Sequence, residues 1–329
     1  MAMPALQFFS TVFAVVSCVL NCIVVVVIVK YRKTNQSLNG SFFSLIILNS
    51  CVDVIFAVQF NILMRARKYR MLDFILKEGN ALWYIVPRLC CFHYYIKAVH
   101  YMINILLAFN RFTSTFYPMY YEVFWQSKKM FATRILAFVI PVFFVLPIVL
   151  NFKNRMWLEM GVSNETVRFY RDEQSTQLMS TIDASLSIGS SVICLTFYVS
   201  AGFILSRRMI QHGMQRKQVI EFRMFLSSFL LFILLPLNSA NHIWTIIASK
   251  QGKTDVVMLL NDISYPFLDV MYSASPWVLL VTSSAIRDAL RRFVLSAVVC
   301  IPQSGRLFKK TTTVGQTTSR MSRTSVPNT

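Results

Sequence analysis

The sequence predicts an all-α integral membrane protein, a bundle of seven transmembrane helices with a short amphipathic helix after the seventh span. The first observation is composition: 55% of the 329 residues are hydrophobic and only 14% are charged, whereas soluble domains carry about 25% charged residues. The second is the arrangement of the apolar residues in seven stretches, each able to cross a bilayer core of about 30 Å as a helix. These numbers argue against a soluble enzyme and against a disordered chain.

The seven stretches are separated by short loops, and together they form one membrane-spanning domain at 1–300. The tail at 301–329 is rich in Ser and Thr, and we expect it to be disordered and cytoplasmic. After the seventh span, 287–299 has apolar residues on one helical face and arginines on the other, which predicts an amphipathic helix on the inner leaflet. We expect the spans at about 4–29, 38–64, 90–109, 135–152, 178–205, 224–248 and 258–284.

The net charge of +19 would suggest nucleic acid as a partner of a soluble protein. In a membrane protein, a positive net charge follows from the enrichment of Lys and Arg in cytoplasmic loops, so we expect no nucleic acid as a partner. The first span has no basic residue before it and Lys30, Arg32 and Lys33 after it. We therefore expect the N-terminus outside and the C-terminus inside at the plasma membrane, although the basic segment 65–70 locally favours the opposite.

Two positions outside the spans are candidates for modification. Cys300 follows the amphipathic helix directly, where it is placed for palmitoylation or remains a plain thiol. Asn164 begins an Asn-Glu-Thr triplet in the longest outer loop, where glycosylation is possible and a chance triplet is the alternative.

Ionisable residues inside spans are costly, so each is a candidate functional residue. Lys97 is 14 residues before Arg111, about 21 Å along a helix, which places its ammonium deep in the bilayer. His93 and His100 share its helical face. Lys97 needs an anionic partner, for which the depth along the bundle favours Asp269 over Asp53. The alternative is that Lys97 faces a ligand.

We therefore name as ligand-binding candidates His93, Lys97, His242 and Asp269. If Lys97 is unpaired, the pocket that it forms with His93 would suit an acidic odorant. Asp183 and Asp262 lie near the outer ends of their predicted spans, so we expect them to be interfacial.

Enzyme signatures are absent: the chain has no H-E-x-x-H, no G-x-S-x-G and no P-loop. Cys90, Cys91 and His93 are too close on one helix to converge on a metal ion, so we expect no metal and no cofactor.

The residues at the inner end of the third span resemble those of rhodopsin-type G-protein-coupled receptors. Asn110-Arg111-Phe112 followed by Pro118 is similar to the D-R-Y segment, with Asn110 in place of the acid. Asn21 and Asp53 resemble the buried polar pair of that family, and we group them with His100 and Asn104 as a polar network in the bundle core. Ser275-Pro276 stands where the family has Asn-Pro.

A longer set of residues resembles the nematode chemosensory serpentine receptors of class gamma: Asn110 to Ser114, Pro118, Tyr121, Trp125, Pro276-Trp277 and Arg287. The resemblance implies a chemosensory receptor of sensory neurons that binds a small molecule within the bundle and activates a heterotrimeric G protein. It implies that Arg111, with Asn110 and Pro118, takes part in G-protein coupling. Pro236 and Pro276 are then candidate hinges.

Two other classes remain open from the residues alone. A transporter would favour repeated halves with broken helices in matching positions, for which Pro141/Pro147 and Pro266/Pro276 are the nearest hint. A ligand-gated channel subunit would require the opposite orientation in the membrane.

Overall fold

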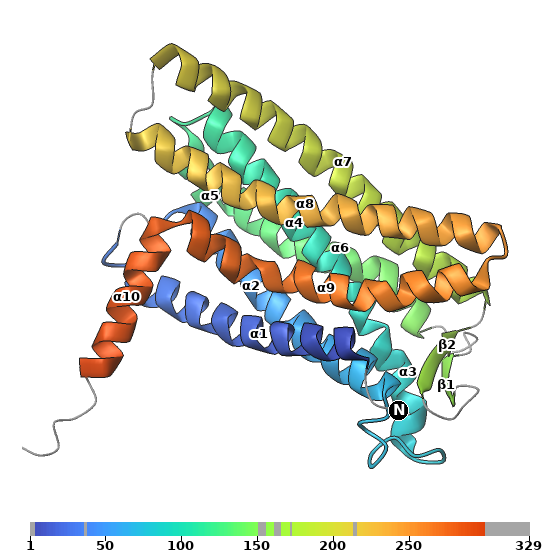
Figure 1. The fold of residues 1–329 in the computed structure, drawn as a ribbon. Helices are drawn as coiled ribbons and strands as arrows, with labels where there is room; N and C mark the ends of the chain where they lie inside the picture. Colours follow the sequence, from blue (N-terminus) through green and yellow to red (C-terminus); the bar gives the residue numbers. More distant parts are fainter. Residues whose placement is uncertain are drawn as a thin grey trace, which may run out of the picture.

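The computed structural model describes residues 4–35, 38–150, 156–160, 166–171, 173–212 and 216–299. Across these residues, seven long helical segments run alongside one another as a bundle (Figure 1). Their order along the chain is α1 (Ala5–Tyr31), α2 (Ser41–Gln59) continued by the π-helix η2 (Phe60–Ala66), α4 (Phe92–Phe116), α6 (Lys128–Leu150), α7 (Glu173–His212), α8 (Arg216–Lys250) and α9 (Thr254–Thr282). The seven-helix membrane fold predicted from the sequence is confirmed.

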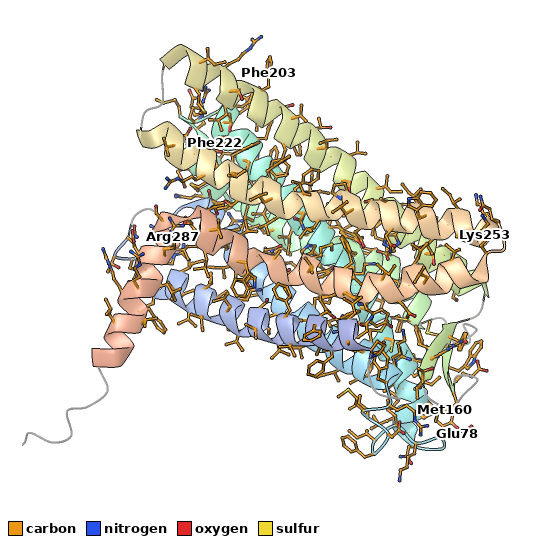
Figure 2. All side chains as sticks on the ribbon, viewed as in Figure 1. Glu78, Met160, Phe203, Phe222, Lys253 and Arg287 are labelled. Atoms are coloured by element: carbon orange, nitrogen blue, oxygen red, sulfur yellow. The ribbon has the colours of Figure 1, made fainter. Side chains whose placement is uncertain are left out.

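The two ends of the bundle carry different additional elements. At the end that holds the start of α1, the short helix α3 (Ala81–Cys90) packs against the antiparallel strands β1 (Met156–Met160) and β2 (Val167–Arg171). We call this the hairpin end; Met160 of β1 lies there (Figure 2). The opposite end carries α5 (Tyr121–Gln126) and α10 (Ser284–Val299), the helix that follows the seventh span. We call it the α10 end. Asn164, Cys300 and the tail at 301–329 lie outside the described residues.

Within the described residues, five helical segments are long and apolar enough to cross a membrane by length and composition alone. The more polar α4 and α9 complete the bundle. The polarity of α4 follows from its position, because it packs against α2, α6, α7 and α8. Since 16 of its 25 residues are buried, its charged and amide side chains face protein rather than lipid. The five apolar segments are Ala5–Tyr31, Ser41–Ala66, Lys128–Pro147, Leu178–Ile210 and Glu221–Ala248.

Several helices extend beyond the stretches expected from the sequence, although α2 begins three residues later and α9 ends two residues earlier than expected. The third helix of the bundle continues to Phe116, seven residues past the predicted limit, which is about 10 Å further. The fifth, α7, begins at Glu173 instead of 178 and ends at His212 instead of 205. An apolar stretch marks only the part of a helix that lies in hydrocarbon, whereas the backbone hydrogen bonds continue through polar residues. The hairpin, α3 and α5 were not predicted.

An ion pair between Arg65 and Asp269 links three segments near the hairpin end. Arg65 lies in η2 and Asp269 in α9, with an Nη2–Oδ2 distance of 2.5 Å, and both side chains are almost fully buried. The same guanidinium donates to Gln7 and Ser10 of α1 and to Asn61 of η2. Because these acceptors come from α1, η2 and α9, the pair fixes how the three pack.

This geometry corrects two expectations. The sequence predicts Arg65 just outside the second span, but its side chain is 1% exposed inside the bundle. Asp269 was the first choice as partner of Lys97, yet its carboxylate faces α1 and η2, where Arg65 occupies it. The rise per residue along a helix gives the position of Asp269 along the bundle axis but not the direction in which its side chain points.

The buried pair predicts a large loss of stability when one partner is removed. In detergent or nanodiscs, Arg65→Ala should lower the free energy of unfolding by about 3–5 kcal/mol, because it strands the Asp269 carboxylate. The matched control is Arg70→Ala at the Arg70–Asp73 pair, whose side chains are 37% and 39% exposed; such a pair contributes about 0–1 kcal/mol. Thermal unfolding of the purified variants compares the two. Equal losses would contradict the structural role of Arg65.

Candidate functional site

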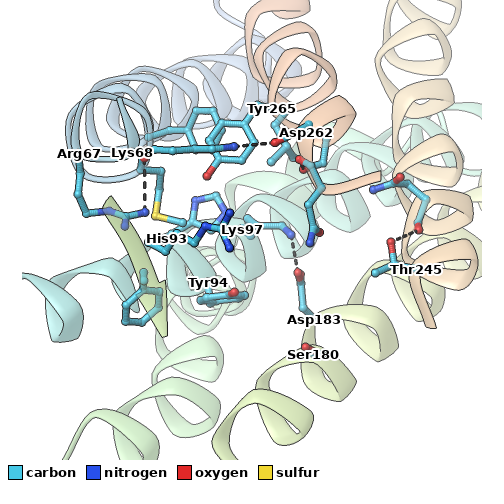
Figure 3. Close-up of a pocket in the computed structure, with 18 of the residues that line it drawn as sticks. Arg67, Lys68, His93, Tyr94, Lys97, Ser180, Asp183, Thr245, Asp262 and Tyr265 are labelled. Atoms are coloured by element: carbon cyan, nitrogen blue, oxygen red, sulfur yellow. Dashed lines mark hydrogen bonds and ion pairs between the residues drawn. The ribbon is translucent and has the colours of Figure 1, made fainter. Parts of the chain in front are cut away.

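A cavity of about 670 Å³ opens at the hairpin end of the bundle. Small-molecule sites occupy about 300–1,000 Å³, so this volume suits a small ligand. Its walls come from η2, α4, α7, α8 and α9, and β2 closes one side (Figure 3). Aromatic rings supply much of the lining: Phe60, Tyr69, Tyr94, Phe169, Tyr170 and Tyr265. The cavity therefore combines apolar surface with the polar groups described below.

The floor of the cavity holds an ion pair between Lys97 of α4 and Asp183 of α7 (Figure 3). Both side chains are buried, at 4% and 8% exposed. The Tyr101 hydroxyl donates to the other Asp183 oxygen at 3.1 Å. His242 of α8 completes the group, with its Nε2 atom 3.5 Å from the carboxylate.

This pair corrects the expected partner and position of two residues. Lys97 does have an anionic partner in the bundle, but the partner is Asp183 and neither Asp269 nor Asp53. Asp183 is not interfacial: since α7 begins at Glu173, Asp183 lies ten residues into the helix, about 15 Å from its start. A polar stripe on α7 was the available signal, because Ser187, Ser190 and Ser191 follow Asp183 at helical spacing and are buried with it.

Hydrogen bonds extend from the ion pair into α8. Asn238 donates through Nδ2 to the Tyr101 hydroxyl at 3.0 Å and to Ser187 at 3.2 Å. Ser187 and Ser239 are joined at 2.8 Å. The floor is thus a continuous polar network between α4, α7 and α8, so a ligand that disturbs Lys97 or Asp183 acts on the contacts of three helices.

Three of the four predicted ligand-binding residues line this cavity: His93, Lys97 and His242. His93 is buried, and its Nδ1 atom lies 3.1 Å from Gln59 Nε2. Asp269 does not line it. Sequence reasoning missed Arg67 and Lys68 at the rim, because the residues after the second predicted span count there as a loop. It also excluded Asp183 and Asp262 from the ligand-binding candidates, because both lie near the outer ends of their predicted spans.

The predicted core network is partly assembled below the cavity. The Asp53 carboxylate lies 3.1 Å from His100 Nδ1 and accepts a hydrogen bond from Asn49 at 2.8 Å. Asn104 donates to the His100 carbonyl within its own helix. Asn21 is buried, but its side-chain oxygen accepts no hydrogen bond among the described residues. The carboxylate is therefore held by α4 and by its own helix.

Arg111 lies near the α10 end of α4 and is 4% exposed. Its guanidinium donates to Asn110 Oδ1 at 2.6 Å and stacks over the Phe42 ring at 4.0 Å. Asn110 also accepts from the Tyr121 hydroxyl of α5. Among the described residues, Arg111 forms no ion pair with any carboxylate, and this includes Glu221. The Phe42 ring and the Asn110 amide contact its guanidinium in place of an acidic side chain.

The prolines named from the sequence occupy the expected elements. Pro118 is exposed between α4 and α5. Pro236 lies inside α8 and Pro276 inside α9, where each removes one backbone hydrogen bond of its helix. Their role as hinges stays a prediction.

Reciprocal exchange tests the Lys97–Asp183 pair. Lys97→Asp and Asp183→Lys should each destabilise the protein by about 3–5 kcal/mol, because each leaves like charges facing one another in a buried site. Combining them should recover part of that loss, measured as the thermal unfolding midpoint of purified protein. The matched control combines Lys97→Asp with Asp269→Lys and should recover nothing. If the Lys97/Asp183 double variant equals the sum of its singles, the two residues are not coupled.

Comparison with known proteins agrees with this architecture. The crystal structure of squid rhodopsin superimposes with a TM-score of 0.68 and 14% sequence identity, over 90% of this chain and 81% of that one. None of the curated proteins compared with the chain matches it. The model of the Srg family of chemoreceptors matches residues 7–290. Because that match spans nearly the whole helix bundle, the chain belongs to the Srg family of chemoreceptors.

Proposed function

We propose that this protein is a chemosensory G-protein-coupled receptor, which binds a small molecule in the cavity at the hairpin end and activates a heterotrimeric G protein at the α10 end. The observation that carries the proposal is the cavity with its ion-paired floor. The floor joins α4, α7 and α8, and Arg111 lies on the same α4 helix about 21 Å from Lys97. A change at the floor can therefore reach the other end through one continuous helix.

The proposed orientation places the hairpin end and the N-terminus outside the cell, in the plasma membrane of a sensory neuron. The distribution of basic residues supports it, since 20 of the 33 Lys and Arg residues fall on the side assigned to the cytoplasm. The exposed Arg291 and Arg292 of α10 support it as well, because basic amphipathic helices bind anionic inner leaflets.

Protease protection tests this topology. A tag fused to the C-terminus should survive protease added to sealed cells, whereas a tag fused to the N-terminus should be removed. Permeabilised cells serve as the control, in which both tags are digested. Removal of the C-terminal tag from intact cells would reverse the orientation and favour the channel alternative.

Signalling assays with paired variants test the function. The chain is expressed with a G-protein reporter and exposed to a panel of volatile and water-soluble small molecules. Responses should be abolished by Arg111→Ala at equal surface expression, and lost in Thr245→Trp, which fills the cavity that Thr245 lines. Two controls should respond normally: Lys129→Ala, an exposed basic residue near the α10 end, and Thr196→Trp, an exposed position on α7 outside the cavity.

Arg111→Ala and Thr245→Trp test different parts of the proposal. A response that persists in Arg111→Ala would remove Arg111 from coupling, and one that persists in Thr245→Trp would place the ligand elsewhere. A response that does not depend on any G protein would contradict the receptor mechanism itself.

A further inference from the structure

The charges that line the cavity do not balance among themselves. Four cationic side chains line it, Arg67, Lys68, Lys97 and Arg168, against two carboxylates, Asp183 and Asp262. Each carboxylate is already paired with a lysine: Lys97 with Asp183, and Lys68 with Asp262 at 2.6 Å. Both guanidinium groups are left without a carboxylate partner among the described residues.

Arg67 is the more constrained of the two. It is 3% exposed, and its donors are directed to neutral backbone carbonyls: Leu63 at 2.8 Å, Val167 at 2.9 Å and Met64 at 3.5 Å. A guanidinium has five N–H donors, so these three bonds leave two open. A buried cation held only by carbonyl dipoles lacks a counter-charge, and an anion placed beside it gains more than it would in water.

Arg168 lines the same cavity and directly follows, in β2, the residue that Arg67 binds. The Arg67 guanidinium donates to the carbonyl of Val167, the residue before Arg168 in β2. Arg168 is half-buried and lines the cavity, and its side chain forms no hydrogen bond or ion pair in the described part of the chain. Figure 3 shows Arg67 at the β2 side of the cavity with its side chain directed toward His93.

We infer that the ligand of this cavity is a small organic carboxylate, whose carboxylate group binds Arg67 and Arg168. The inference rests on the proposed function and specifies its ligand class. Guanidinium groups bind carboxylates through paired N–H donors, and the two open donors of Arg67 suit one carboxylate oxygen each. An amine is disfavoured, since Asp183 and Asp262 are already paired.

The rest of the ligand is an apolar or aryl group. Phe60, Tyr265 and Leu268 also line the cavity, and apolar and aromatic surfaces of this kind bind apolar groups by burial. This placement differs from an anion site at Lys97, because the ammonium of Lys97 is ion-paired with Asp183 whereas neither Arg67 nor Arg168 forms an ion pair among the described residues.

Matched chemical series test the ligand class. The full-length protein in nanodiscs is screened by thermal shift with straight-chain and aryl-substituted carboxylates, each accompanied by its primary amide, alcohol and amine. Carboxylates should bind, and the uncharged and cationic analogues should bind at least about tenfold more weakly, because they lose charge-assisted hydrogen bonds. Short water-soluble acids and long-chain fatty acids form separate arms of the screen. The arm in which binding is found shows whether the ligand comes from solution or from lipid.

Variants locate the carboxylate. Two variants, Arg168→Gln on the strand surface and Arg67→Lys, should each weaken the binding of carboxylates about tenfold or more and leave the weak binding of amides unchanged. Arg67→Lys keeps the charge but not the planar fork of the guanidinium. Arg67→Gln should weaken carboxylate binding further. The comparison uses Arg67→Gln protein whose thermal unfolding midpoint without ligand equals that of the unchanged protein. The control Arg70→Gln removes an arginine of the same segment that does not line the cavity and is paired with Asp73, and it should leave affinity unaltered.

Three outcomes would overturn the inference. Binding of only amines or uncharged compounds would reject the carboxylate while leaving the receptor function intact. Carboxylate binding that is lost in Lys97→Gln but kept in the Arg67 and Arg168 variants would move the anion site to the floor. Absence of any binder in a folded protein that also fails to signal would reject the cavity as a ligand site, and with it the proposed function.

Discussion

The ammonium group of Lys97 sets the constraint around which this bundle packs. A lysine in the middle of a central helix cannot face lipid without a cost of several kcal/mol, so a neighbouring helix must present a carboxylate to it. Asp183 does so from α7, the Tyr101 hydroxyl donates to its other oxygen, and Asn238 in turn donates to Tyr101. This requirement fixes the rotation of α4 and α7 relative to one another. Arg65 and Asp269 impose the same restriction on η2, α1 and α9.

Composition and apolar stretches were sufficient for the fold because a bilayer imposes a length and a polarity on every span. They were insufficient for the pairing of charges. A rise of 1.5 Å per residue places Lys97 and Asp269 at similar depths, but depth contains no information about which neighbour a side chain faces. Asp183 was assigned to the interface because the predicted span began at 178, whereas the helix begins five residues earlier.

The rim of the cavity was harder to predict for a different reason. Arg65, Arg67 and Lys68 form a basic cluster that resembles a solvated loop and counts against the inferred orientation. In the structure the helix continues through them as η2 and beyond, Arg65 and Arg67 are buried, and Val167 of β2 accepts a hydrogen bond from Arg67. That contact joins residues 100 positions apart, and a two-stranded hairpin in a loop has no strong local signal.

The positions of these charges separate two tasks that a receptor ligand must perform. A ligand shifts a conformational equilibrium only by its difference in affinity for the two states. Arg67 and Arg168 are attached to η2 and β2, outside the contacts between α4, α7 and α8, so an anion bound there adds affinity to every state that keeps the rim in place. The floor is different, because Lys97, Asp183 and His242 belong to three separate helices. Under the proposed function and the inferred ligand class, the carboxylate that anchors a ligand therefore lies at one end of it, and the group that activates the receptor lies at the other. Ligands that share a carboxylate can then differ in efficacy through the part that reaches the floor.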